Sequence, residues 1–136
     1  MRTKVFILTN NPKAKEEYPE AFFVGKEFLD ILLYARDLIH LGHRLISHPL
    51  TGSVKPKETK YKSILMTAEA QSLDMKSLQL IESAIVTTEK FKEVKRNWPD
   101  VKKIDEDFQV IDLTLLQAGV EALNSSTEQL VAFSGS

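Results

Sequence analysis

The run Val5-Phe6-Ile7-Leu8 constrains the fold of this chain more than any other feature of its sequence. All four side chains are apolar, so a strand over these residues is covered on both faces, as in a sheet with helices packed on each side. Asn10-Asn11-Pro12 follows and is a turn signal, because asparagine bonds its own backbone and proline cannot donate to a strand ladder. The start of the chain therefore predicts an inner strand of an α/β sheet.

Residues 26–41 carry the clearest helical pattern. Their apolar residues recur at spacings of three and four and line one face of a helix: Phe28, Ile31, Leu32, Ala35, Leu38 and Ile39. Gly42 is expected to end this helix, because glycine readily takes the left-handed conformation of the position after a helix. Further helices are expected over residues 12–18, from 72 or 74 to no later than 99, and over 113–123. Strands are expected over 21–24, 43–47, 61–66 and 108–111, although the last segment also fits helical spacing.

Strands that alternate with helices in this way predict an α/β fold. We expect a small, largely parallel or mixed sheet of about four to five strands flanked by helices. The length of 136 residues fits one domain. We therefore predict a single α/β domain over residues 1–123 and a flexible C-terminal tail over residues 124–136.

Composition and charge exclude several classes of protein. Lys and Arg number 18 against 19 Asp and Glu, a net charge of -1, so the strong basic excess of a nucleic-acid-binding domain is absent. No apolar run approaches the ~20 residues that a membrane span needs, and the first residues lack a signal-peptide pattern. The chain contains no cysteine, which excludes disulfides, thiolate metal sites and cysteine nucleophiles. We therefore expect a cytoplasmic protein without a nucleic-acid or membrane partner.

Polar residues gather where two of the expected strands end. Ligands in open α/β sheets bind beyond the carboxyl ends of strands. Asn10 and Asn11 follow the first expected strand, and His48 follows the expected strand over residues 43–47. The following loop adds a glycine, a hydroxyl and a lysine, which are the components of an anion site. If the first and third expected strands pair, these groups are neighbours. The predicted ligand-binding residues are Asn10, Asn11, Arg36, His48, Gly52, Ser53 and Lys55.

A metal site is the alternative for the three histidines, which lie close together at His40, His43 and His48 beside Asp37. Neutral imidazole and carboxylate suit zinc. His40 and His43, however, lie on opposite sides of the expected helix end, and a strand rising ~3.3 Å per residue carries His48 about 15 Å from His43. We therefore predict no metal, and since no dinucleotide or Walker motif occurs, no cofactor.

Several motifs in order resemble the GrdX family: Thr9-Asn10-Asn11-Pro12, the stretch from Arg36 to His43, and Leu45 to Leu50 with its Gly52-Ser53 and Tyr61-Lys62-Ser63 continuation. A weaker similarity continues at Asp107-Phe108 and Ile111-Asp112. The resemblance implies a small accessory or regulatory protein of the glycine, sarcosine and betaine reductase systems of anaerobic amino-acid-fermenting bacteria. It implies no catalytic residues, because the family has no established activity.

Three functions stay open at this point. The first is an accessory or regulatory domain that binds a small anionic metabolite or a reductase-system protein through the residues at the strand ends. The second is an enzyme that uses His48 as an acid–base group. The third is a structural protein that acts as a homodimer.

Overall fold

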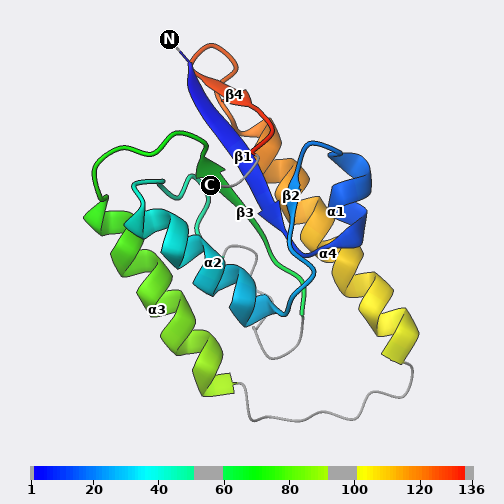
Figure 1. The fold of residues 1–136 in the computed structure, drawn as a ribbon. Helices are drawn as coiled ribbons and strands as arrows, with labels where there is room; N and C mark the ends of the chain where they lie inside the picture. Colours follow the sequence, from blue (N-terminus) through cyan, green and yellow to red (C-terminus); the bar gives the residue numbers. More distant parts are fainter. Residues whose placement is uncertain (1, 51–59, 92–100, 134–136) are drawn as a thin grey trace.

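The computed structural model describes residues 2–50, 60–91 and 101–133 and contains a sheet with helices on both faces (Figure 1). The elements in chain order are β1 (Thr3–Thr9), α1 (Pro12–Glu17), β2 (Phe22–Phe23), α2 (Phe28–His40), β3 (Ser63–Thr67), α3 (Met75–Phe91), α4 (Val101–Glu121) and β4 (Glu128–Leu130). No helix within these described ranges combines the length and the apolar character needed to cross a membrane.

Strand β1 is the centre of the sheet, as its apolar sequence predicts. It pairs antiparallel with β3, from Val5 opposite Thr67 to Thr9 opposite Ser63. It pairs in parallel with β2 near its end and with β4 near its start. The sheet is therefore mixed, and the predicted α/β class is confirmed.

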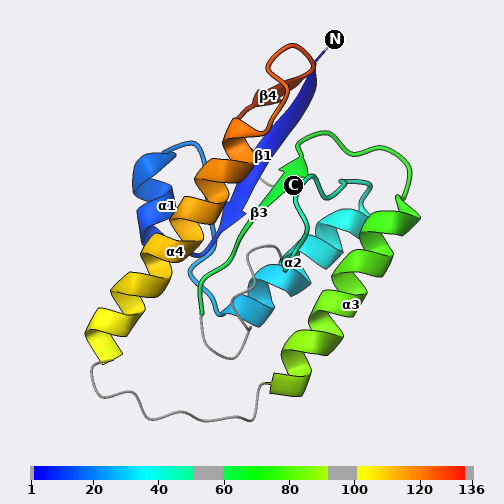
Figure 2. The same cartoon turned by 180° about the vertical axis from the view of Figure 1, so that it is seen from behind.

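Alternate residues of β1 enter two separate cores, because successive side chains of a strand point to opposite faces. Phe6 and Leu8 pack in the core that α2 and α3 cover. Val5 and Ile7 pack in the core that α1 and α4 cover. Figures 1 and 2 show the two pairs of helices on opposite sides of the sheet.

Helix α2 ends as the sequence predicts. The N–H of Gly42 donates to the carbonyl of Ile39, and the N–H of His43 donates to the carbonyl of Leu38. These two bonds form a Schellman motif, which needs a left-handed residue after the helix. Gly42 supplies it with φ +110°.

The predicted strand over residues 43–47 is wrong, so the condition that it pairs with the first strand is not met. Leu45 makes only an isolated bridge to Met66, and the N–H groups of Ile46 and Ser47 both donate to the carbonyl of Leu65. The segment thus borders β3, and β3 is the strand that pairs with β1. With Leu45 and Ile46 alone at its centre, the segment has too short an apolar run to form a ladder of its own.

The second wrong prediction is the strand over residues 108–111. Residues 101–121 form one continuous helix, α4. The helical spacing of Phe108, Ile111, Leu115 and Gly119 was the correct indication, because tertiary packing along one helix face outweighs local strand propensity.

The structure also differs from the expected boundary at residue 123. Residues 128–130 form β4 beside β1, and the N–H of Thr3 donates to the carbonyl of Thr127. The ring of Phe133 stacks on Phe6 with 4.2 Å between centroids. A strand of three residues has too short a pattern to be found in a sequence, and here its position beside β1 defines it.

Asp105 anchors helix α4 to the segment that leads into β3. Its Oδ2 accepts hydrogen bonds from the Tyr61 hydroxyl at 2.7 Å and from Gln109 Nε2 at 2.9 Å, and its Oδ1 lies 2.9 Å from Lys60 Nζ. Burial alone would raise the pKa of Asp105, but the hydrogen bonds from Tyr61, Lys60 and Gln109 outweigh it and hold the pKa below its usual value.

We expect Asp105→Asn to lower the free energy of unfolding by about 1 kcal/mol at pH 7, because it removes a charge-assisted contact. A carboxyl group with a lowered pKa in the folded state stabilises the fold above its unfolded pKa of about 4 and loses this effect as the pH falls through the folded pKa. The difference between variant and wild type should therefore shrink on acidification. Urea unfolding at pH 7 and at about pH 3 measures it, with exposed Asp107→Asn as the control. An equal difference at both pH values would contradict the assignment.

Candidate functional site at the end of the first strand

Asn10 stands at the end of β1, where the sequence predicts it, and its side chain is turned into the protein. Its Nδ2 donates to the carbonyls of Lys26 and Lys60 at 2.8 and 2.6 Å, and its Oδ1 accepts the N–H of Lys62 at 2.8 Å. These bonds use both amide hydrogens. Asn10 therefore ties the end of β1 to the chain entering α2 and the chain entering β3.

Asn11 is fully buried and joins α1 to α4. Its Oδ1 accepts the N–H of Lys13 at 3.0 Å, which caps α1. Its Nδ2 donates to the carbonyl of Gln109 at 2.8 Å and to Asp112 Oδ2 at 3.0 Å. Both amide hydrogens are again donated within the protein, so the two asparagines shape the strand end, and contact with a ligand stays a prediction for them.

Asp112 is the centre of a buried hydrogen-bond network, with 8% of its surface exposed. Its Oδ1 accepts the N–H of Ser63 at 3.1 Å, and its Oδ2 accepts the Ser63 hydroxyl at 2.6 Å in addition to Asn11. Since Ser63 gives its one hydroxyl hydrogen to the carboxylate, the Thr9 hydroxyl, 2.7 Å away, must donate to Ser63. The network thus connects β1, β3 and α4.

A cavity of about 270 Å³ lies next to this network, between α4 and the start of β3. We call it the strand-end cavity. Its lining residues come from three segments: Ser47 and His48; Lys62, Ser63 and Leu65; and Asp112, Leu115, Leu116, Ala118 and Gly119. Apolar walls with a few converging polar groups are typical of small-molecule sites.

Lys62 contributes a buried amine to the lining, with 7% of its surface exposed. Burial lowers the pKa of Lys62, because removal from water penalises the charged form, and the negative charge of Asp112 partly opposes this effect. A lysine with a lowered pKa in a cavity is a recognised indication of a binding or reactive site. The strand-end cavity therefore combines a buried amine and a buried carboxyl group with an apolar wall.

His48 is the predicted ligand residue that does line this cavity. Its ring is exposed, and its Nδ1 accepts the N–H of Leu50 at 3.0 Å. The hydrogen of the neutral ring is then on Nε2, which gives the cavity rim a hydrogen-bond donor.

The other predicted residues are not assembled with His48. Arg36 lies on α2 and pairs with Glu82 of α3 at 3.6 Å, away from the cavity lining. Gly52, Ser53 and Lys55 lie outside the described residues. Within the described ranges, no group of three or more side chains could hold a metal ion. His43, considered above as a metal ligand, is buried with Nδ1 2.8 Å from the carbonyl of Thr67, to which it donates.

A model of the GrdX-like protein family matches residues 6–121, most of the 136-residue chain. The chain belongs to the GrdX-like family. The resemblance inferred from the motifs is thereby confirmed, and the strand-end cavity of this GrdX-like chain falls entirely within the matched residues. Searches of curated proteins and of solved structures found no match.

Sequence reasoning missed four polar residues of the GrdX-like cavity: Ser47, Lys62, Ser63 and Asp112. Two signals could have revealed the last three. Lys62 and Ser63 directly precede the buried run Ile64 to Met66, so they must sit where a strand begins. Asp112 lies among the apolar residues of α4, and a carboxylate on an apolar helix face needs a polar partner.

Proposed function

We propose that this GrdX-like chain is an accessory or regulatory protein of glycine, sarcosine and betaine reductase systems, and that it binds a small metabolite with an anionic carboxylate group in the strand-end cavity. The observation that carries the proposal is the buried Lys62 beside Asp112 in a small cavity with apolar walls. The reductase setting comes from the family resemblance of the motifs around Asn10, Arg36 and His48.

The charges of the cavity specify what a ligand should carry. A carboxylate would interact strongly with the Lys62 ammonium, because a desolvated site screens charges less than water does. Ser47 accepts the N–H of Leu65 through its Oγ at 3.0 Å, so its hydroxyl can still donate to an anion. Asp112 would repel a pure anion but attract an ammonium group. A ligand that carries both charges, such as an amino acid, should therefore bind more tightly than a simple carboxylate.

We expect glycine, sarcosine or betaine to bind with saturation in calorimetric titrations, and acetate to bind about tenfold more weakly, because it lacks the positive group that Asp112 attracts. Lys62→Met should weaken binding of the best ligand by at least about tenfold, since the charge-assisted contact is lost. The variant should stay folded, because methionine keeps most of the length of the side chain and Asp112 retains its hydrogen bonds from Ser63 and Asn11. Lys76→Met, at an exposed position of α3, is the matched control and should change nothing.

Ala118→Leu gives a second, independent test, because it narrows the cavity without changing a charge. It should also weaken binding of the best ligand by at least about tenfold. The proposal fails if none of these compounds binds, or if the affinity survives both Lys62→Met and Ala118→Leu.

A further inference from the structure

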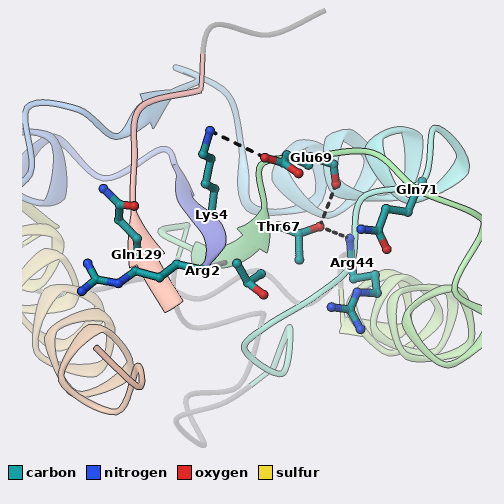
Figure 3. Close-up of a pocket in the computed structure, with 9 residues that line it drawn as sticks. Arg2, Lys4, Arg44, Thr67, Glu69, Gln71 and Gln129 are labelled. Atoms are coloured by element: carbon teal, nitrogen blue, oxygen red, sulfur yellow. Dashed lines mark hydrogen bonds and ion pairs between the residues drawn. The ribbon is translucent and has the colours of Figure 1, made fainter. Parts of the chain in front are cut away.

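A second hollow, of about 480 Å³, lies at the opposite end of β1 from the strand-end cavity (Figure 3). We call it the basic hollow. Its charged lining residues are Arg2, Lys4, Arg44 and Glu69. Figure 3 shows the Arg2 side chain on the same side of the hollow as Gln129 and Arg44 on the other side, with Lys4 reaching toward Glu69.

The charges of the basic hollow do not balance. Lys4 Nζ lies 3.7 Å from Glu69 Oε1, so this pair is partly neutralised. Among the described residues, no carboxylate lies within ion-pair distance of Arg2 or Arg44, and Asp74 interacts with Arg44 only at longer range. Three cations against one carboxylate leave a net charge of about two positive units in the lining.

Backbone contacts hold the walls of the hollow in place. The N–H of Gln71 donates to the carbonyl of Gly42 at 3.0 Å, and the N–H of Arg44 donates to Thr67 Oγ1 at 2.8 Å. The N–H of Ala68 donates to the carbonyl of Lys4 at 2.7 Å. The chain segments that carry Arg44 and Lys4 are therefore fixed relative to each other, which lowers the entropic cost of binding between them.

We propose that the basic hollow binds a small organic phosphate. A doubly charged phosphate head balances the excess positive charge, and arginine guanidinium groups match phosphate oxygens with paired hydrogen bonds. The remaining lining carries no charge, and the side-chain amides of Gln71 and Gln129 can bond a hydroxylated body. The volume is in the range of sites for small organic molecules, so the space extends beyond a phosphate group alone.

This site is separate from the strand-end cavity and from the carboxylate proposed there. Arg2, Lys4 and Gln129 lie outside residues 6–121, the range that the family model matches. No residue lines both sites. Binding at one site can therefore fail while binding at the other holds.

Calorimetric titration of the full chain at fixed ionic strength with glycerol 3-phosphate, inorganic phosphate and glycerol tests the proposal. We expect glycerol 3-phosphate to bind most tightly, inorganic phosphate more weakly, and glycerol not at all. Arg44→Gln should weaken binding of glycerol 3-phosphate about fivefold or more, because one of the two arginine contacts is lost. Arg36→Gln, an arginine already paired with Glu82, and Lys62→Met in the other cavity should leave it unchanged.

Glu69→Gln should change the affinity in the opposite direction. It removes the one carboxylate of the lining and releases Lys4, so glycerol 3-phosphate should bind about threefold more tightly. A gain in affinity cannot arise from a folding defect. The proposal is overturned if glycerol 3-phosphate does not bind, if glycerol binds as tightly, or if neither Arg44→Gln nor Glu69→Gln moves the affinity in the stated direction.

Discussion

Replacing Asp112 by alanine is expected to lower the free energy of unfolding by about 4 kcal/mol. The carboxylate accepts hydrogen bonds from the Ser63 N–H, the Ser63 hydroxyl and Asn11 Nδ2. Alanine offers no acceptor, so up to three buried donors lose their partner, and each loss costs about 1–3 kcal/mol of stability. Part of this free energy is recovered because the Ser63 hydroxyl can turn toward another acceptor. It also removes the negative charge that lies beside buried Lys62, which adds to the loss.

Urea unfolding at pH 7 measures this effect by linear extrapolation. Asp107→Ala on the exposed side of the same helix is the control and should cost less than about 0.5 kcal/mol. A loss below about 1 kcal/mol in Asp112→Ala, close to that of an ordinary surface change, would contradict the role of the network in joining β1, β3 and α4.

Gly42→Ala is the second large effect, with an expected loss of about 3 kcal/mol or more. Gly42 has φ +110°, a conformation that costs a residue with a Cβ roughly 1–3 kcal/mol. An added Cβ would also lie 1.9 Å from the carbonyl oxygen of Gln71 and 2.7 Å from its nitrogen. Because both atoms belong to the backbone, the end of α2 or the segment at Gln71 must move to relieve the clash.

Gly25→Ala is a matched control for this prediction. Its added Cβ would have the Phe23 ring at 3.5 Å as its nearest neighbour, which is an ordinary contact. The control should stay within about 1 kcal/mol of wild type. If thermal unfolding gives the two variants the same midpoint, the strain assigned to Gly42 is wrong.

The sequence predicted those elements whose pattern is long or fully apolar. The run Val5 to Leu8 became the central strand, and the stripe from Phe28 to Ile39 became α2 with Gly42 at its end. These patterns determine the fold because burial of their apolar side chains is the largest favourable term in the free energy of folding. Residues 108–111 and β4 were missed for the opposite reason, since a short segment takes its conformation from the element it packs against.

The candidate site was predicted in part. The strand end at Asn10 and Asn11 was predicted because turn residues after a strand have a local signal. His48 lines the cavity rim, but it was singled out as the end of a strand over residues 43–47 that the structure does not contain. The assembly of these residues with Lys62 and Asp112 was not predicted, because it depends on β3 pairing with β1 and on α4 crossing the sheet. Such long-range pairing has no signature in any single segment of the sequence.

The most direct test of the central claim, that the strand-end cavity binds a small carboxylate metabolite beside Lys62, is a glycine titration followed by amide NMR of the full chain. We predict saturable shifts that cluster at residues 47–48, 62–65 and 112–119 and that disappear in Lys62→Met. Shifts that gather elsewhere on the molecule, or that persist unchanged in the variant, would contradict the claim.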